Sequence, residues 1–478
     1  MSNTGQPHAV VIGAGIAGLA AAFFLREVPC RVTVLEGSPR LGGKLSVSEI
    51  AGVMVDEGAE ALLARRPEGT GLAAAAGLEG QLTWPGTTAA RIWSRGRMCP
   101  LPRRQVLGVP ADLTELAGTG LMSSDGMARA RQDLGLPATA RDGDVPVAAF
   151  VAARFGREVV DRLVDPLLAG VYAGRSEELS FDATLPAVAA ESRKHASLAE
   201  AAGALLPDPA GSSSPDPVPV FTTLAGGLGT LPAAVAAASG ASVRADATVR
   251  GLARTASGWR LTVGSRHAEE YLTADAVILA VPASPAARLL DGVPGASAAV
   301  TALREIRYAS MAIVTLAYQA TAFPQPLEGS GYLVPAVDGR PVKAVTFSTV
   351  KWPHLREAGG GLHIVRCSVG RIGEESLLQR GDAELASLAA TDLAAATGAH
   401  EAPVVTRVTR WGGGLPQYTV GHLDRVARIR SAVAGQPGLA VCGAAYDGIG
   451  IPACVATAQT AAGQIAAYLR DDRQWERG

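Results

Sequence analysis

Near its beginning the chain reads Ala9-Val-Val-Ile-Gly13-Ala-Gly15-Ile-Ala-Gly18-Leu-Ala-Ala-Ala-Phe23. An apolar strand runs into three glycines at the G-x-G-x-x-G spacing, and a helix rich in alanine follows. Gly13 permits a tight turn, Gly15 lets the backbone approach a pyrophosphate, and Gly18 allows close helix–strand packing. The phosphates then lie at the helix N-terminus, where unpaired N–H groups favour negative charge. The stretch predicts a dinucleotide-binding βαβ unit whose contact residues are Gly13, Ala14, Gly15, Ile16, Ala17 and Gly18.

A second strand, residues 31–35, ends at Glu36, about 20 residues past the glycines, where a ribose hydroxyl needs an acceptor. The chain continues Gly37-Ser-Pro-Arg40-Leu-Gly42-Gly43-Lys44, and this R-x-G-G run resembles the FAD-binding start of the flavin amine oxidase superfamily. Adjacent glycines leave N–H groups open to a phosphate or a flavin ring, and Arg40 adds a cation near the pyrophosphate. The pattern favours FAD over free NAD, and no arginine follows Glu36 directly, which counts against NADP.

The composition indicates a globular protein of more than one domain. The chain has 478 residues, of which 48% are hydrophobic and 18% charged, enough for two or three domains. A net charge of −1 gives no sign of a nucleic-acid partner. The cysteines are scattered without a C-x-x-C pair, which favours a reducing compartment and predicts neither a disulfide framework nor a metal site. Without a basic leader or an apolar run of about 20 residues, we expect a cytoplasmic protein with no transmembrane segment.

The order of strands and helices predicts an α/β fold with a discontinuous, Rossmann-like FAD-binding domain. Apolar strands return at residues 241–244, 258–263 and 275–281, and a last strand and helix occupy 439–443 and 452–469. Residues 91–204 have a helical pattern, and 205–219 form a Pro/Ser-rich linker. We predict an FAD-binding domain from 1–56, 217–291 and 437–478, a mixed α+β substrate-binding domain from 57–90 and 292–436, and a helical subdomain from 91–216.

A second glycine-rich motif precedes the last helix, Gly443-Ala-Ala-Tyr446-Asp-Gly448-Ile-Gly450-Ile-Pro452-Ala-Cys454. Pro452 suits the first helical turn, so the helix N-terminus would present amide donors to the negative pyrimidine edge of a reduced flavin. A plain strand–loop–helix crossover is the alternative reading. A free cysteine such as Cys454 is usually a small buried apolar residue rather than a nucleophile. The residues expected at the flavin from this half of the chain are Val243, Trp411, Gly443, Ile449, Gly450, Ile451 and Pro452.

Four further motifs occur in order: DPLLAGVYAGRSEELS (165–180), GYLVP (331–335), FSTVKWPH (347–354) and LPQYTVGH (415–422). Together with both glycine motifs they resemble the protoporphyrinogen/coproporphyrinogen oxidase family of haem synthesis. The resemblance implies a fold of the p-hydroxybenzoate hydroxylase/amine oxidase type. It covers nearly the whole chain. Ala59, Ala453 and Thr457-Ala458 depart from residues common in that family.

A compact chain without a membrane anchor resembles the Gram-positive branch of the family. That branch implies FAD-dependent, six-electron oxidation of coproporphyrinogen III to coproporphyrin III, with dioxygen as acceptor, hydrogen peroxide as product, and transient contact with a ferrochelatase. The alternatives are a protoporphyrinogen IX oxidase, a flavin amine oxidase or carotenoid desaturase, and a non-catalytic carrier of flavin or porphyrin.

Several residues of these motifs are candidates for the substrate site. The backbone at Gly170 permits close approach of a substrate, although a turn after a helix explains it equally well. Tyr172 is expected to form a wall. Glu60 would lie near the ring edge and Lys44 near flavin or substrate, unless both are solvated surface charges. Four propionates call for cations, and the candidates are Arg65, Arg66, Arg103, Arg104, Lys343 and Lys351, of which Arg65 and Lys351 are preferred. For His354 and His422 we expect a structural hydrogen bond.

Overall fold

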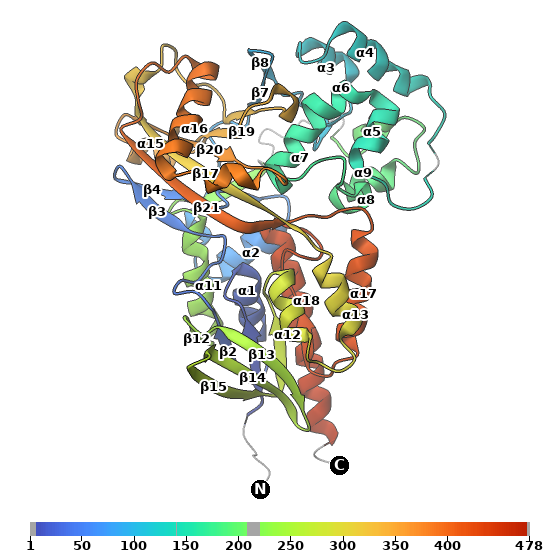
Figure 1. Ribbon diagram of the computed structural model, residues 1–478, viewed down its shortest axis with the longest axis vertical. Helices are drawn as coiled ribbons and strands as arrows, with labels where there is room; N and C mark the ends of the chain where they lie inside the picture. Colours follow the sequence, from blue (N-terminus) through green and yellow to red (C-terminus); the bar gives the residue numbers. More distant parts are fainter. Residues whose placement is uncertain (1–5, 140, 208–219, 476–478) are drawn as a thin grey trace.

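The computed structural model describes residues 6–139, 141–207 and 220–475 (Figure 1). The glycine motif begins a parallel sheet in which β1 (His8–Ile12) is central. The other strands come from distant parts of the chain: the order is β12 (Ser242–Arg244), β2 (Arg31–Leu35), β1, β16 (Ala276–Leu279) and β22 (Leu439–Val441). All these pairings are parallel, so the carboxyl ends of the strands meet at one edge, where α/β folds bind ligands.

Both faces of the parallel sheet are covered, as its near-continuous apolar strands require. Val11 and Val34 pack under helices on one face, whereas Val10 and Leu35 pack on the other. The first face carries α1 (Ile16–Leu25), α2 (Pro67–Ala75), α11 (Leu231–Ser239) and α18 (Ile451–Trp475). The second carries the antiparallel strands β13 (Val249–Thr255), β14 (Gly258–Ser265) and β15 (Ala268–Ala274), and the helices α12 (Ala283–Leu290), α13 (Ser297–Arg304) and α17 (His422–Ala434).

A seven-stranded sheet lies above the parallel sheet in Figure 1. Its order is β21 (Val405–Pro416), β17 (Tyr308–Gln319), β20 (Leu362–Val369), β19 (Val342–Phe347), β18 (Gly331–Leu333), β7 (Ala90–Ser94) and β8 (Arg97–Pro100). Only the β18–β7 pair among these is parallel. Helix α16 (Asp382–Thr397) covers one face, where Leu385 and Leu393 pack with Val314 and Leu316. On the opposite face, Ala317 and Ile364 pack in a second cluster with Trp352, while Ile313 and Arg366 line a cavity.

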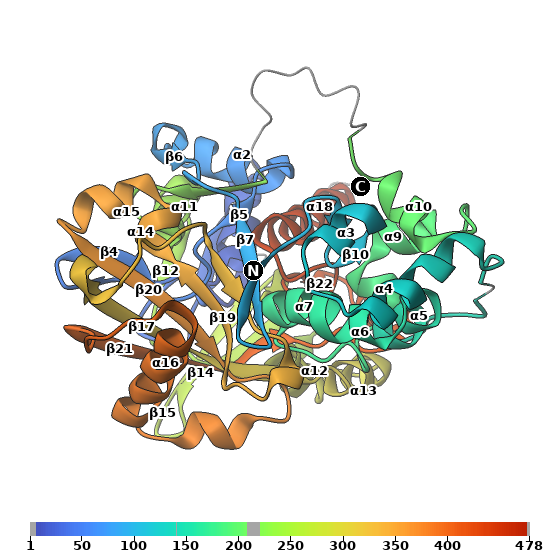
Figure 2. The same cartoon turned by 90° about the horizontal axis from the view of Figure 1, so that it is seen from above.

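Helices α14 (Ser348–Lys351) and α15 (Pro353–Ala358) pack against β20 and β4. The other α-helices form a separate layer beside the seven-stranded sheet, seen from above in Figure 2. They share one apolar core and comprise α3 (Leu113–Gly118), α4 (Ser124–Arg131), α5 (Val147–Phe155), α6 (Arg157–Val159), a π-helical turn (Val160–Val164), α7 (Asp165–Tyr172), α8 (Phe181–Thr184), α9 (Pro186–Glu191) and α10 (Leu198–Gly203). Short strands complete the molecule: β3 (Val47–Ile50) pairs with β4 (Val53–Asp56), β9 (Gln105–Val106) with β10 (Val109–Pro110), and β11 (Phe221–Leu224) with β5 (Leu62–Leu63) and β6 (Leu82–Thr83).

The structure confirms the strands predicted near residues 241–281 and 439–443, and the last helix. The predicted helical pattern is confirmed from Leu113 onward, but residues 90–110 contain the strands β7 to β10. The reason is long-range pairing, because β7 joins the sheet through β18, which lies far along the chain. Helices α13 and α17, predicted within the substrate-binding domain, pack on the parallel sheet. Residues 208–219 of the predicted linker lie outside the described residues, and the division into three domains stays a prediction.

Candidate functional site

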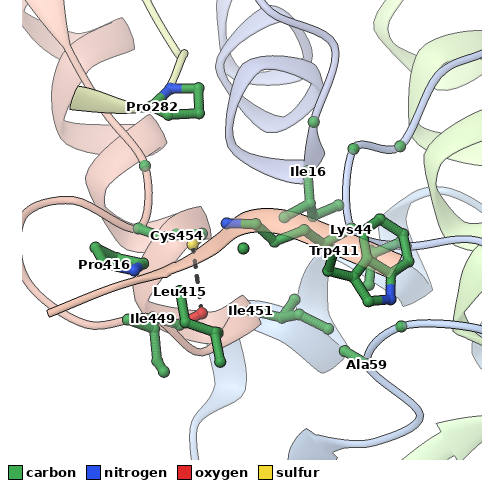
Figure 3. A pocket seen from close by; sticks show the side chains of 18 of the residues that line it. Ile16, Lys44, Ala59, Pro282, Trp411, Leu415, Pro416, Ile449, Ile451 and Cys454 are labelled. Atoms are coloured by element: carbon green, nitrogen blue, oxygen red, sulfur yellow. Dashed lines mark hydrogen bonds between the residues drawn. The ribbon is translucent and has the colours of Figure 1, made fainter. Parts of the chain in front are cut away.

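A cavity of about 620 Å³ opens where the parallel sheet, the seven-stranded sheet and α7 meet. Its walls come from the turns after β1 and β2, from residues 58–61, from α7, from β17, β19, β20 and β21, and from the loop before α18. Figure 3 shows that side chains far apart in sequence, such as Ile16, Trp411 and Ile451, converge on it. Its size suits a small-molecule ligand, since such pockets span about 300–1,000 Å³.

Each of the three glycine positions after β1 favours glycine for a different structural reason. Gly13 adopts φ +103°, and a Cβ atom added there would lie 2.6 Å from the Ala280 carbonyl oxygen. A Cβ at Gly18 would lie 1.9 Å from the Gly13 carbonyl oxygen, so only glycine lets α1 sit this close. A Cβ at Gly15 would meet nothing within 4 Å, because Gly15 faces the cavity. No side chain caps α1, so its first amides are open to an anion in the cavity.

The turn after β2 pairs with this glycine loop. The Glu36 carboxylate accepts hydrogen bonds from the Ala14 amide (2.8 Å) and the Ser38 amide (2.9 Å), and it lines the cavity. The Gly42 amide donates to the Ala14 carbonyl (2.8 Å). Arg40 holds the turn from outside, since its guanidinium donates to the carbonyls of Gly43 (2.6 Å) and Leu45 (3.2 Å). Arg40 is not among the described residues that line the cavity.

The loop between β22 and α18 is held by the 415–422 motif. The Tyr418 hydroxyl donates to the Ala444 carbonyl and accepts from the Gly448 amide, both at 2.8 Å. His422 stacks on the Tyr418 ring at 3.7 Å, and its Nε2 lies 2.9 Å from the Tyr446 carbonyl oxygen. Burial lowers the pKa of His422 to about 4, so the ring is neutral at pH 7 and Nε2 carries the donated hydrogen. His422 therefore has the structural role expected for it.

Two residues from opposite ends of the chain meet at the cavity, Lys44 and Cys454. Burial raises the pKa of the Cys454 thiol to about 11, against the opposing charge of Lys44, so it stays protonated at neutral pH. Burial also lowers the pKa of Lys44, whose Nζ has no hydrogen bond or ion pair with any of the described residues. Figure 3 shows its side chain extending across the cavity. Its ammonium lies 6.0 Å from the centre of the Tyr308 ring. A largely buried cation with an aromatic ring but no anion beside it fits an anionic or electron-rich ligand.

Glu60 lies on the cavity wall between two cations. Its Oε1 accepts from Lys351 Nζ at 2.6 Å and its Oε2 from Arg366 Nη1 at 2.5 Å. Burial alone would raise the pKa of Glu60, but the charges and hydrogen bonds of Lys351 and Arg366 outweigh it and lower the pKa to about 2. Arg366 also donates to the Gly58 carbonyl (2.5 Å). The Glu60 carboxylate is therefore ionised at neutral pH and faces two basic side chains.

Of the predicted substrate residues on α7 and at the surface, some line the cavity and others do not. Gly170 lines the cavity, whereas Tyr172 is buried behind it with its ring 5.6 Å from that of Tyr418. Burial raises the pKa of Tyr172 to about 12, so it remains a neutral phenol. Arg65 is exposed, and Arg66 pairs with Glu68 at 2.5 Å.

Other predicted cations are also absent from the cavity lining. Lys343 is buried and donates to the Ser368 hydroxyl (2.7 Å) and the Gly370 carbonyl (2.8 Å). Burial, together with the charge of Arg371, lowers the pKa of Lys343 to about 7. The Arg104 guanidinium donates to the Pro207 carbonyl at 3.1 Å, and Arg103 is exposed.

Most predicted site residues converge on the cavity. Its lining includes Gly13, Gly15, Ile16, Ala17, Glu36, Gly42, Gly43, Lys44, Glu60, Gly170, Trp411, Gly443, Ile449 and Ile451. The others do not line it: Ala14, Gly18, Gly37, Arg40, Arg65, Tyr172, Val243, Lys351, Gly450 and Pro452. Tyr308, Met311 and Arg366, which line it from β17 and β20, belong to no motif of the sequence. Strict alternation along β17 would place Tyr308 and Met311 on opposite faces, and the register shift between Ala309 and Met311 allows both to face the cavity.

Two further kinds of feature are absent from the residues that the structure describes, a group of metal ligands and a membrane-spanning helix. Among the described residues no group of three or more His, Cys, Asp or Glu side chains could hold a metal ion. No helix within those ranges is both long and apolar enough to cross a bilayer.

Comparison with known proteins defines the class. A family model described as flavin containing amine oxidoreductase matches residues 16–466, and the chain belongs to this family. The glycine loop, the open amides of α1 and the cavity fit its cofactor, and the protein is an FAD-dependent oxidoreductase.

Relatives narrow the comparison further. The chain is 40% identical to the coproporphyrinogen III oxidase of Mycobacterium tuberculosis (strain ATCC 25618 / H37Rv), over 96% of this chain and 97% of that protein. It is 32% identical to the coproporphyrinogen III oxidase of Bacillus subtilis (strain 168), over 98% and 99%. A solved structure from Exiguobacterium sp. 255-15, provisionally named protoporphyrinogen oxidase, has a TM-score of 0.84 and 30% identity and covers 97% of this chain and 99% of its own.

Proposed function

We propose that this protein oxidises coproporphyrinogen III to coproporphyrin III in haem biosynthesis. The observation that carries the proposal is the cavity, in which the dinucleotide loop, a lysine without an anionic partner among the described residues, and Glu60 face one space. The names of the mycobacterial and Bacillus relatives support this substrate. A substrate with four carboxylates needs cations, and Lys44 and Arg366 are the cationic side chains among the described residues that line the cavity.

When bound, FAD supplies an acceptor for a hydride, and three such two-electron steps remove six electrons. The chain's own residues bind and orient. We assign the pyrophosphate to the glycine loop and the first amides of α1, and the ribose to Glu36. We assign the flavin ring to the N-terminus of α18 and to Lys44. The positive end of the helix and the charge of the lysine would stabilise electrons added to the ring.

The substrate side is assigned to α7 and the seven-stranded sheet. The backbone at Gly170 allows close approach of the flat macrocycle, because a side chain there would project into the cavity. The apolar side chains of Met311, Ile313 and Leu415 exclude water from the reacting edge. Lys351 and Arg366 both donate hydrogen bonds to Glu60, so the three side chains form one polar group on the substrate side. Arg65 is the candidate for binding a propionate at the rim.

Further parts of the proposal concern the setting of the reaction. Dioxygen is the proposed electron acceptor, with hydrogen peroxide as product, and the porphyrin passes by transient contact to a ferrochelatase. The cytoplasm is the proposed location, which agrees with the scattered cysteines of the sequence. We also keep the three-domain division at the boundaries given above, with the cavity between the domains.

One assay separates the candidates. Holoenzyme is given coproporphyrinogen III and protoporphyrinogen IX separately, and porphyrin fluorescence, oxygen uptake and peroxide are followed in air. We expect faster oxidation of coproporphyrinogen III. Preference for protoporphyrinogen IX, the substrate named for the Exiguobacterium structure, would reverse the assignment. Turnover of amines without porphyrin formation would instead indicate an amine oxidase.

A further inference from the structure

A second, much smaller chamber lies on the other side of Glu60. Its volume is about 10 Å³, and Glu60 belongs to the walls of both this chamber and the large cavity. Asp56, Thr223, Trp352 and His354 also line it. These residues come from β4, from β11 and from the segment after α14 (Ser348–Lys351). The chamber therefore separates the Glu60 carboxylate from the partly exposed His354 ring.

Three chamber residues contain a buried polar atom without a hydrogen-bond partner among the described residues. They are Thr223 Oγ1, Trp352 Nε1 and His354 Nδ1. Thr223 and Trp352 are only 2% and 1% exposed, so bulk water does not reach them. An unsatisfied buried donor or acceptor costs about 1–3 kcal/mol, which makes three of them around one chamber improbable without a ligand. A buried water needs about 10–15 Å³ and typically makes about three hydrogen bonds.

We propose that this chamber binds one water molecule, and that Glu60, this water and His354 form the path by which protons leave the substrate cavity. Trp352 Nε1 donates to the water, while Thr223 Oγ1 and His354 Nδ1 complete its hydrogen bonds. The second part of the inference rests on the proposed function, whereas the water site does not.

The proposed reaction requires such a path. In each two-electron step a C–H bond breaks and its hydrogen leaves with the electron pair as a hydride. In two of the three steps an N–H bond then breaks and its electron pair stays on nitrogen. In the other step a second C–H bond breaks and its electron pair enters the conjugated ring, so that four C–H and two N–H hydrogens are lost in all. Each step thus releases one proton from the substrate. Loss of the hydride leaves a cationic substrate whose N–H is strongly acidic, so even the weakly basic Glu60 carboxylate can accept it. His354 passes the proton from the chamber to its exposed side.

The charged groups around the chamber agree with this direction of transfer. Burial lowers the pKa of His354, although the charges of Glu357 and Glu60 oppose this, so the ring is neutral and can accept a proton at pH 7. Burial raises the pKa of Asp56 to about 6, against hydrogen bonds from the amides of Gly229 and Leu228. Asp56 can thus hold a proton transiently. Lys351 and Arg366 stay bonded to Glu60 and favour release of the proton toward the chamber.

The test replaces His354 by alanine in the holoenzyme. We expect porphyrin formation at pH 7 to slow by about 10- to 100-fold, the lower range for loss of a proton-transfer group. Added imidazole should restore the rate, and the solvent deuterium isotope effect should rise. His363→Ala is the matched control, because His363 is similarly buried but does not line the chamber. An unchanged rate in His354→Ala, or a slow variant that imidazole leaves slow, would overturn the proton path.

A second variant tests the water without removing the histidine. Thr223→Val keeps the shape of the side chain but removes one partner of the water. In a crystal structure of the wild-type holoenzyme we expect a water within hydrogen-bonding distance of the three atoms, and in Thr223→Val a weaker or missing one. An empty chamber in the wild type would refute the site. A wild-type enzyme that does not oxidise coproporphyrinogen III refutes the proposed function instead and leaves the crystallographic test in force.

Discussion

Two neighbouring carboxyls, Asp56 and Glu60, show how a single residue's surroundings set its charge. Both are buried, which by itself raises a carboxyl pKa. Asp56 is bonded mainly to backbone amides, and its pKa stays raised at about 6. Glu60 has two cationic partners, and its pKa falls to about 2. The cavity wall is therefore charged because Lys351 and Arg366 are present, and removal of the carboxylate would leave them uncompensated.

The substitution Glu60→Gln tests this. We expect the free energy of unfolding at pH 7 to fall by about 3 kcal/mol, because two buried cations lose their partner. The depressed pKa stabilises the fold above the unfolded value of 4.5, and this contribution is lost as the pH falls toward 2. In urea unfolding, the gap between wild type and variant should thus narrow from pH 7 to pH 3. The control Glu328→Gln, at an exposed pair with Arg91, should change stability by less than about 0.5 kcal/mol, and a gap independent of pH would contradict the assignment.

At this scale the sequence reveals residues that belong to a motif and misses those that do not. Lys44 follows the Gly42-Gly43 pair, and Glu60 lies in the Glu57-Gly-Ala-Glu60 segment, so their positions could be predicted. Arg366 lies in an ordinary alternating strand, and its partner Glu60 is 306 residues away. Arg65 has the right charge and a family-like position, yet no local pattern shows whether a side chain turns to the cavity or to solvent. It is exposed.

The turn between β1 and α1 is an element whose three glycines are not interchangeable. Gly15→Ala places its methyl group in open space, and φ −70° at this position is compatible with alanine. We expect a normal fold with FAD affinity weakened about tenfold or more, equal to about 1.4 kcal/mol, because the methyl group occupies the cofactor's approach. Gly18→Ala instead forces backbone against backbone and should lower both stability and FAD content.

The measurement is flavin absorbance per protein, with the melting temperature of the FAD-free form as the second readout. Gly463→Ala, on the helix α18 with nothing within 4 Å of an added Cβ, is the control; it should match the wild type in FAD content, and its melting temperature should not fall, because alanine favours a helix interior. Equal loss of stability in Gly15→Ala and Gly18→Ala would show that the first glycine serves the fold and not the ligand.

The helices and strands that could be predicted from the sequence are those with a strong local pattern of residues. The buried runs at β1, β16 and β22 and the long helix α18 are each evident from apolar periodicity and flanking glycines. Strands β7 and β8 are four or five residues long and gain stability by pairing with each other and with β18. The pairing of β7 with β18 joins residues more than 200 positions apart, so a short stretch of sequence cannot predict it.

For the whole molecule, the segment from Leu415 to His422 joins the three parts around the cavity. The Gln417 side-chain amide donates to the Tyr172 carbonyl at the end of α7 (2.8 Å), and the Ser180 amide donates to the Tyr418 carbonyl (2.8 Å). The Tyr418 hydroxyl meanwhile bridges two backbone groups of the loop before α18. Leu415 and Pro416 themselves line the cavity. One short segment thus fixes the proposed substrate side relative to the proposed flavin side.

Tyr418→Phe breaks only the last of these links. The ring, its stacking on His422 and the Gln417 bond remain, but the Gly448 amide and the Ala444 carbonyl lose a shared partner, which costs about 1–3 kcal/mol. Because the free loop can relax, we expect a small loss of stability and about tenfold weaker FAD binding, measured by fluorescence titration of the FAD-free protein. Tyr271→Phe, an exposed phenol bonded to Glu269, is the control and should bind FAD as the wild type does. If Tyr418→Phe binds FAD equally well while its melting temperature falls, the hydroxyl stabilises the fold without positioning the loop, and the proposed coupling between the two sides of the cavity is wrong.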